Sequence, residues 1–277
     1  MTQPLHRNLI QLQHQWLERF GSDVCVDLHC HCLPGLDDGP QNMEEALCLC
    51  KALVSQGITT VIATPHQLGR FDGCYDVDVI RCTTSHLNTA LQEQGIPLDV
   101  LPGSEIRVDE RICALLKQGH LLTMGDQGRF VLLELPYDLY LNLEPLLAQI
   151  SELGLRAIIA HPERNKILAL EPERIRTWAD YDPIIQITGA SLLGRFGPTI
   201  QQASFHFLDM PSAKLVATDA HDCASRGPCV LEAFDMIVRD RGKTLARQLF
   251  IEEPLALIGA LNEQQTENVE ERRAWLS

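Results

Sequence analysis

The chain has 277 residues, and its 45% of apolar residues excludes a disordered protein. Asp and Glu number 37 against 23 Lys and Arg, which gives a formal net charge of -14. This charge argues against binding to the phosphate backbone of nucleic acid and against docking on an anionic membrane. No linker rich in Pro, Gly and Ser divides the sequence, so a single domain is expected.

The N-terminal segment predicts an amphipathic helix, because its apolar residues recur every three or four positions: Leu5, Leu9, Leu12, Trp16 and Phe20. We expect a helical extension over residues 1–22, which either caps the bottom of the fold or mediates an oligomer contact; capping is favoured. The segment lacks the continuous apolar run of a signal peptide, and the chain has no apolar stretch of about 18 residues. A cytoplasmic location without membrane insertion is therefore expected.

Short apolar runs alternate with longer amphipathic stretches along residues 23–277. The runs are typical of buried parallel strands and cover Val24–Leu28, Thr59–Ala63, Leu98–Leu101, Phe130–Leu133, Arg156–Ala160, Pro183–Ile187 and Lys214–Ala217. The stretches between them predict helices, among them Met43–Gln56, Val77–Gln94, Leu143–Leu153 and Pro228–Arg239. This repeated alternation favours an α/β barrel or a doubly wound sheet.

The ten cysteines are predicted to be reduced thiols, because the chain is long and shows no secretion signal. No Cys-x-x-Cys pair occurs, and the two Cys-x-Cys pairs are expected to be small buried hydrophobic residues: Cys30, Cys32, Cys48 and Cys50. No cysteine is followed by Arg six positions later. A Cys-x5-Arg thiol phosphatase is therefore excluded.

The first apolar run continues into a His-x-His pair. In an extended chain alternate residues share a face, so His29 and His31 point to the same side as Asp27. The opposite face is expected to carry Leu28, Cys30 and Cys32. Two imidazoles on one side suit a metal ion, although two hydrogen-bonded histidines would give the same pattern.

The residues at the ends of the other runs favour a metal site over two hydrogen-bonded histidines. Six of the seven runs deliver ionisable residues where apolar character stops: His29 and His31, His66, Glu105, Glu134, His161, and Asp219 with His221. Asp37 and Asp38 lie in the loop after the first run. The carboxyl ends of strands form the site in α/β folds. Imidazole and carboxylate together suit Mn, Fe or Zn better than Ca or Mg.

These residues resemble the PHP (polymerase and histidinol phosphatase) superfamily, and more narrowly its CpsB/CapC protein-tyrosine phosphatases of capsule and exopolysaccharide clusters. The resemblance runs from about Val24 to about Ala260. It rests on the stretches Asp27–Gly39, Ala63–His66, Gly103–Ile106, Leu133–Leu135, Ala160–Arg164 and Ala217–His221. It implies a distorted TIM-like (β/α)7 barrel in a single domain, with the extension at residues 1–22 and the PHP phosphatase domain at residues 23–277.

The resemblance also implies three divalent ions, manganese first, with iron or zinc as alternatives. The nine family ligands match His29, His31, Asp38, His66, Glu105, Glu134, His161, Asp219 and His221. One ion is assigned His29, His31, Glu105 and Asp219; a second Glu105, Glu134 and His161; a third Asp38, His66 and His221. The family's phosphate-binding arginines, which are catalytic and substrate-binding, match Arg164 and Arg226. Asn165 stands where relatives often have Tyr, so that contact with substrate is expected to differ.

The implied activity is metal-dependent hydrolysis of phosphotyrosine without a cysteine nucleophile. Its implied substrate is a bacterial tyrosine kinase that controls capsule synthesis. Three divalent ions outweigh four ligand carboxylates, which suits a phosphate dianion, and metal lowers the pKa of bound water to about 7. The alternatives are a histidinol-phosphate or other small-molecule phosphatase, a polymerase-associated nuclease and a non-catalytic metal-binding scaffold. Relatives can form homo-oligomeric rings, and the oligomeric state of this chain stays open.

Overall fold

The computed structural model describes residues 25–259, so the predicted extension over residues 1–22 lies outside the described part. The strands are β1 (Val26–Cys30), β2 (Thr60–Ala63), β3 (His66–Gln67), β4 (Asp99–Pro102), β5 (Glu105–Arg107), β6 (Phe130–Glu134), β7 (Arg156–Ala160), β8 (Ile184–Thr188) and β9 (Ala213–Ala217). All seven predicted runs are confirmed as strands, with small shifts at their ends. The sequence did not predict β3 and β5, which both begin at a candidate ligand.

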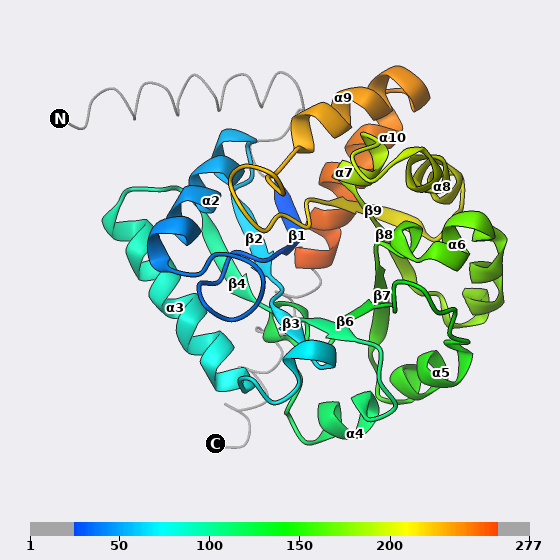
Figure 1. Ribbon diagram of the computed structural model, residues 1–277, viewed down its shortest axis with the longest axis horizontal. Helices are drawn as coiled ribbons and strands as arrows, with labels where there is room; N and C mark the ends of the chain where they lie inside the picture. The colour runs from blue at the N-terminus through cyan, green and yellow to red at the C-terminus, as the bar shows by residue number, and fades with distance from the viewer. Residues whose placement is uncertain (1–24, 260–277) are drawn as a thin grey trace, which may run out of the picture.

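Helices connect the strands and surround them (Figure 1). They are α2 (Met43–Ser55), α3 (Val77–Glu93), α4 (Ile112–Lys117), α5 (Glu144–Glu152), α6 (Lys166–Leu170), α7 (Gly189–Leu192), α8 (Pro198–Leu208), α9 (Val230–Arg241) and α10 (Lys243–Arg247). The start of α2 is set by Asn42, whose side chain accepts a hydrogen bond from the backbone N–H of Glu45 at 3.0 Å. Asp76 caps α3 in the same way through Val79.

The strands pair in parallel in two sheets, of order β1-β2-β4 and β3-β5-β6-β7-β8-β9. An isolated parallel bridge between Cys30 and Ala220 brings the end of β1 beside the residues that follow β9. The fold is therefore a mixed α/β structure in which the carboxyl ends of the strands face the same way.

Two apolar clusters occupy opposite sides of the strands, because side chains along a strand alternate in direction. Along β6, Phe130 and Leu132 belong to the inner cluster, whereas Val131 and Leu133 belong to the larger outer cluster that includes helix residues. Glu134 continues the inner series at the end of the strand. The apolar interior therefore gives way to polar side chains at the carboxyl end.

The alternation is interrupted in β1. Its register with β2 shifts between Asp27 and Cys30. As a result Leu28 lies in the inner cluster, whereas Cys30 and Cys32 lie in the outer one. The prediction that Leu28 shares the face of these cysteines is wrong, because strict alternation does not hold across a bulge.

The cysteines also depart from expectation. Cys48 is exposed and forms a disulfide with Cys223, and their Cα atoms lie 6.0 Å apart. Cys30, Cys32 and Cys50 are buried and free, as predicted. The prediction is wrong for Cys48 because residues two apart on a helix face different directions, so Cys48 and Cys50 cannot both face the core.

Within residues 25–259 no helix is long and apolar enough to span a membrane.

Candidate metal centre

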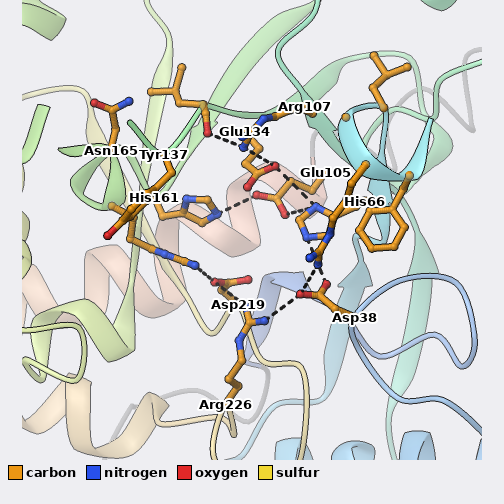
Figure 2. A pocket seen from close by; sticks show the side chains of 16 residues that line it. Asp38, His66, Glu105, Arg107, Glu134, Tyr137, His161, Asn165, Asp219 and Arg226 are labelled. Carbon is orange, nitrogen blue, oxygen red and sulfur yellow. Dashed lines mark hydrogen bonds and ion pairs between the residues drawn. The ribbon is translucent and has the colours of Figure 1, made fainter. Parts of the chain in front are cut away.

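A cavity of about 400 Å³ lies at the carboxyl ends of the strands (Figure 2). Six of the predicted ligands line it: Asp38, His66, Glu105, Glu134, His161 and Asp219. The other three, His29, His31 and His221, are buried and contact the six. The structure thus brings all nine predicted ligands together, from segments spread over most of the chain.

The deepest group consists of two imidazoles and two carboxylates. The Nε2 atoms of His29 and His31 lie 3.2 Å apart. Glu105 Oε2 lies 3.3 Å from each of these nitrogens, and Asp219 Oδ1 lies 3.4 Å from each. These four residues are the same set that the family resemblance assigns to one ion, and their ligand atoms all lie within 4.8 Å of one another.

His66 and His221 converge on a third carboxylate, that of Asp38, at the mouth. The Nε2 atom of each lies 3.4 Å from Asp38 Oδ1, and His31 completes this group. His66 also faces two further carboxylates, with Nδ1 3.2 Å from Glu105 Oε2 and 3.8 Å from Glu134 Oε2. His66 therefore lies between two candidate ion positions.

His161 lies on the other side of Glu105, with Nε2 2.8 Å from Glu105 Oε1 (Figure 2). The structure groups Glu105 and Glu134 with His66, whereas the family resemblance assigns His161 to this pair. The division of ligands among three ions stays a prediction.

The donor atoms fit divalent metal ions. Glu105 Oε2 and His221 Nε2 are buried and have no hydrogen-bond partner among the described residues. Buried polar atoms of this kind are costly unless something pairs with them. The facing nitrogens of His29 and His31 can share only one proton, and imidazole nitrogen with carboxylate oxygen is the donor set of Mn, Fe and Zn. A metal ion would satisfy all these atoms.

The buried imidazoles and carboxylates of the centre shift one another's pKa values. Burial alone would lower the pKa of His29, but Glu105 and Asp219 outweigh it and raise this pKa. Burial alone would raise the pKa of each carboxylate, yet the imidazoles hold both well below the usual range. Burial and the charge of His31 lower the pKa of His221 to about 4. At neutral pH the carboxylates are therefore ionised and His221 is neutral, as metal ligands must be.

Further side chains fix the orientation of the imidazoles. His29 Nδ1 lies 2.8 Å from Gln186 Oε1, and His31 Nδ1 lies 2.6 Å from Asp37 Oδ2. Since each oxygen accepts a hydrogen bond from Nδ1–H, the proton stays on Nδ1 and Nε2 is left free to bind an ion. The sequence missed Gln186, although one polar residue inside an otherwise apolar strand was a usable signal.

Two candidate ligands adopt the left-handed backbone region that non-glycine residues rarely occupy. His161, directly after β7, has φ 31°, and Asp219, two residues after β9, has φ 50°. The Asp219 N–H donates to the carbonyl of His29 at 2.9 Å, which helps to hold it in place. Such strain persists where the surrounding structure over-determines it, and functional sites are common places for it.

Arginines surround the carboxylates. Arg164 forms an ion pair with Asp219, and Arg226 Nη1 lies 3.2 Å from Asp38 Oδ2 (Figure 2). The structure adds two arginines that the sequence did not single out: Arg70 pairs with Asp38 at 2.7 Å, and Arg107 pairs with Glu134 at 3.0 Å. Neither lies in a motif, so only the fold reveals them.

Aromatic and apolar side chains form part of the cavity wall. Phe71 stacks on His66 with ring centroids 5.4 Å apart and an interplanar angle of 10°. Leu68 and Tyr137 also line the cavity, and Tyr137 is 54% exposed. The cavity therefore combines strongly polar side chains with apolar and aromatic ones.

Asn165 lines the same cavity, but its side chain is occupied by structural hydrogen bonds. Its Oδ1 accepts from the backbone of Ile167 and Leu168, which caps α6, and its Nδ2 donates to the carbonyls of Pro136 and Leu139. The residue therefore stabilises the loop beside Arg164.

Comparison with known proteins agrees with this geometry. Residues 25–259 match the model of the family described as Capsular polysaccharide synthesis, CpsB/CapC. The tyrosine-protein phosphatase YwqE of Bacillus subtilis is 33% identical over 227 residues, which cover 81% of this chain and 88% of YwqE. The tyrosine-protein phosphatase CpsB of Streptococcus pneumoniae is 27% identical over 84% of this chain and 98% of CpsB.

A solved structure gives the same relationship. It comes from crystal structures of YwqE from Bacillus subtilis and CpsB from Streptococcus pneumoniae, described as unique metal-dependent tyrosine phosphatases. It superposes with a TM-score of 0.75 at 33% identity and covers 80% of this chain and 89% of that one. Family model, sequence identity and fold agree, and the chain belongs to the CpsB/CapC family of capsular polysaccharide synthesis.

Proposed function

We propose that this chain is a metal-dependent phosphatase that removes phosphate from phosphotyrosine in proteins. The observation that carries the proposal is the convergence of nine His, Asp and Glu side chains on one cavity that Arg164 and Arg226 also line. Relatives named tyrosine-protein phosphatases support it.

In this proposal the nine side chains hold three divalent ions, assigned as manganese, with iron or zinc as alternatives. When bound, such ions act as Lewis acids and lower the pKa of water toward 7. The nine ligands include four carboxylates, whose charge three divalent ions outweigh. The cavity floor is then positive and attracts a phosphate dianion, although the chain as a whole is acidic.

Arg164 and Arg226 bind the phosphoryl oxygens. Each guanidinium has five N–H donors in a planar fork, so it can remain paired with Asp219 or Asp38 and still offer donors to phosphate. Donors fixed in this way stabilise the charge that develops on the equatorial oxygens during phosphoryl transfer.

The apolar and aromatic part of the cavity lining favours an aryl ester over an alkyl one. Leu68, Phe71 and Tyr137 line the cavity and offer apolar surface to an aromatic ring. A phenolate leaving group has a pKa near 10, so it departs with little protonation. Hydrolysis of an aryl phosphate therefore depends less on a general acid than hydrolysis of an alkyl phosphate does.

We also propose that the strands form a distorted (β/α)7 barrel in one phosphatase domain over residues 23–277, with residues 1–22 as a helical extension. The bridge between Cys30 and Ala220 supports closure of such a barrel. The substrate is assigned as a bacterial tyrosine kinase of capsule synthesis, on the strength of the family. A cytoplasmic location remains a prediction, and the oligomeric state stays open.

A substrate panel tests the function. Protein stripped by a chelator and reloaded with Mn²⁺ is assayed on a phosphotyrosine peptide, a phosphoserine peptide and histidinol phosphate. We expect turnover of the phosphotyrosine peptide only after reloading. Preference for histidinol phosphate would replace the substrate assignment, and loaded protein inactive on all three would indicate a metal-binding scaffold.

A further inference from the structure

A disulfide joins two segments that also meet at the candidate metal centre. Cys48 lies in the middle of α2, and Cys223 lies 175 positions later in the sequence. Cys223 belongs to the loop of residues 221–229, which we call the Arg226 loop. This loop begins at His221 and carries Arg226. Among the ten cysteines, all of them within the described residues, the other eight are free.

The Arg226 loop has a defined internal structure. Asp222 organises it, because its Oδ1 accepts hydrogen bonds from the backbone of Ala224 at 2.7 Å and of Arg226 at 3.0 Å. The loop is therefore a preformed turn whose position depends on what holds it against the rest of the molecule.

Two other contacts join the same segments. The backbone N–H of Leu231, just after the loop, donates to the side chain of Gln56 at the end of α2 at 3.2 Å. On the cavity side, Arg226 pairs with Asp38, which precedes α2. Both are weak at partly exposed positions. The Cys48–Cys223 bond is the covalent member of this set, on the outer surface.

Both members of the pair are exposed. Small thiols and disulfides in solution can therefore reach the sulfur atoms, whereas most of the free cysteines are buried. Cys74 and Cys82 are also exposed but unpaired. The pair thus differs from every other cysteine in being both accessible and prearranged for a bond, since its Cα separation of 6.0 Å lies within the usual disulfide range.

We propose that Cys48 and Cys223 form a reversible redox modification site, oxidised by low-molecular-weight disulfides such as oxidised glutathione, whose bond restrains the Arg226 loop against α2. One cysteine thiolate attacks oxidised glutathione, which releases one glutathione thiol and leaves a mixed disulfide. The second cysteine thiolate attacks the protein sulfur of that mixed disulfide and releases the second glutathione thiol. The two protein sulfurs are oxidised and the two glutathione sulfurs are reduced, so atoms and electrons balance.

Mass spectrometry tests the bond. The full chain is equilibrated in glutathione buffers from fully reduced to fully oxidised, alkylated and digested without reduction. We expect a peptide pair linked through Cys48 and Cys223 that appears with oxidation and is lost on return to the reduced buffer. The bond should be absent from Cys48→Ser and Cys223→Ser and retained in Cys74→Ser and Cys82→Ser. Linkage through Cys74 or Cys82, or only glutathione adducts, would overturn the proposal.

Amide hydrogen exchange tests the restraint on the loop. Peptides covering residues 222–229 should exchange several-fold faster in reduced than in oxidised wild-type protein, and peptides from α5 should not change. Cys48→Ser should show the fast rate in both buffers. Equal rates in reduced and oxidised wild type would contradict the restraint. Neither measurement depends on phosphatase activity, so failure here is distinct from failure of the proposed function.

Discussion

Gln186 Oε1 lies 2.8 Å from Nδ1 of His29, although the two residues come from strands 157 positions apart in sequence. Gln186 is fully buried in β8, among residues that are otherwise apolar apart from Thr188 at its end. The amide oxygen can only accept, so the proton stays on Nδ1 of His29 and its Nε2 is free for an ion. The strand that carries no predicted ligand therefore still contributes to the centre.

Replacing Gln186 should weaken metal binding without removing a ligand. In Gln186→Met, which keeps the volume and loses the acceptor, we expect a fall in Mn²⁺ affinity of about 10- to 100-fold, as for other residues that orient ligands. Gln186→Glu keeps an acceptor oxygen and should bind Mn²⁺ more tightly than Gln186→Met. Isothermal titration calorimetry compares the three proteins. Equal affinity in all of them would remove Gln186 from the centre.

The two arginines should affect the reaction more than the fold. For Arg164→Ala and Arg226→Ala we expect kcat/KM on a phosphotyrosine peptide to fall by about 10²–10³ each, as for other anion-stabilising donors. Arg195→Ala is the matched control, because Arg195 pairs with Glu232 at the surface. Metal content is measured in parallel, since Arg164 also contacts the candidate ligand Asp219. A wild-type rate in either variant would exclude that arginine.

His161→Ala should lower both metal content and turnover. The imidazole lies 2.8 Å from Glu105, so its loss removes a candidate ligand and a partner of a buried carboxylate. We expect fewer bound ions by elemental analysis and a fall in kcat of several orders of magnitude, on the scale of losing metal catalysis. His206→Ala, whose imidazole pairs with Glu173 at the surface, should behave as wild type. Full metal content in His161→Ala would contradict the assignment.

Metal affinity should rise with pH. The carboxylates raise the pKa of His29 and His31 in the metal-free protein, so protons compete with the metal up to a higher pH than for free histidine. Binding of Mn²⁺ then releases protons, and its affinity increases as pH rises through that range. Calorimetry in buffers of different ionisation enthalpy counts the protons released. Affinity that is constant from pH 5 to pH 8 would contradict this expectation.

Gly39 should not tolerate a side chain. A Cβ at this position would lie 2.4 Å from the carbonyl oxygen of His31 and 3.1 Å from Asp37 Oδ1. Gly39→Ala should therefore displace the loop that carries Asp38 and reduce the free energy of unfolding by about 1–3 kcal/mol. Gly259→Ala, where no atom of residues 25–259 lies within 4 Å of the added Cβ, is the control. Urea denaturation compares the two, and equal midpoints would contradict the steric argument.

Strands with continuous apolar character could be predicted from the sequence. Runs such as Arg156–Ala160 are buried on both faces, and their composition alone marks them. The short strands β3 and β5 could not be predicted, because His66 and Glu105 begin them and polar residues hide the pattern. Local shifts such as the bulge in β1 also left no mark in the sequence, so the face of Leu28 was assigned wrongly.

Within the site, residues at strand ends could be selected because their position follows from the topology. The residues that only the fold reveals are those whose role depends on distance. Arg70 and Arg107 look like surface arginines in the sequence, yet they pair with Asp38 and Glu134. Cys48 and Cys223 lie far apart in the chain, and no local pattern connects them.

The pairing of Cys30 with Ala220 spans 190 positions and links the beginning and the end of the candidate centre. His29 and His31 are synthesised long before Asp219 and His221, by about 10–40 s at ordinary ribosomal rates. The complete ligand set therefore does not exist on the nascent chain until the last strand has emerged. Metal ions therefore bind late in biosynthesis, and they should bind preferentially to chains in which the end of β1 already pairs with the segment after β9.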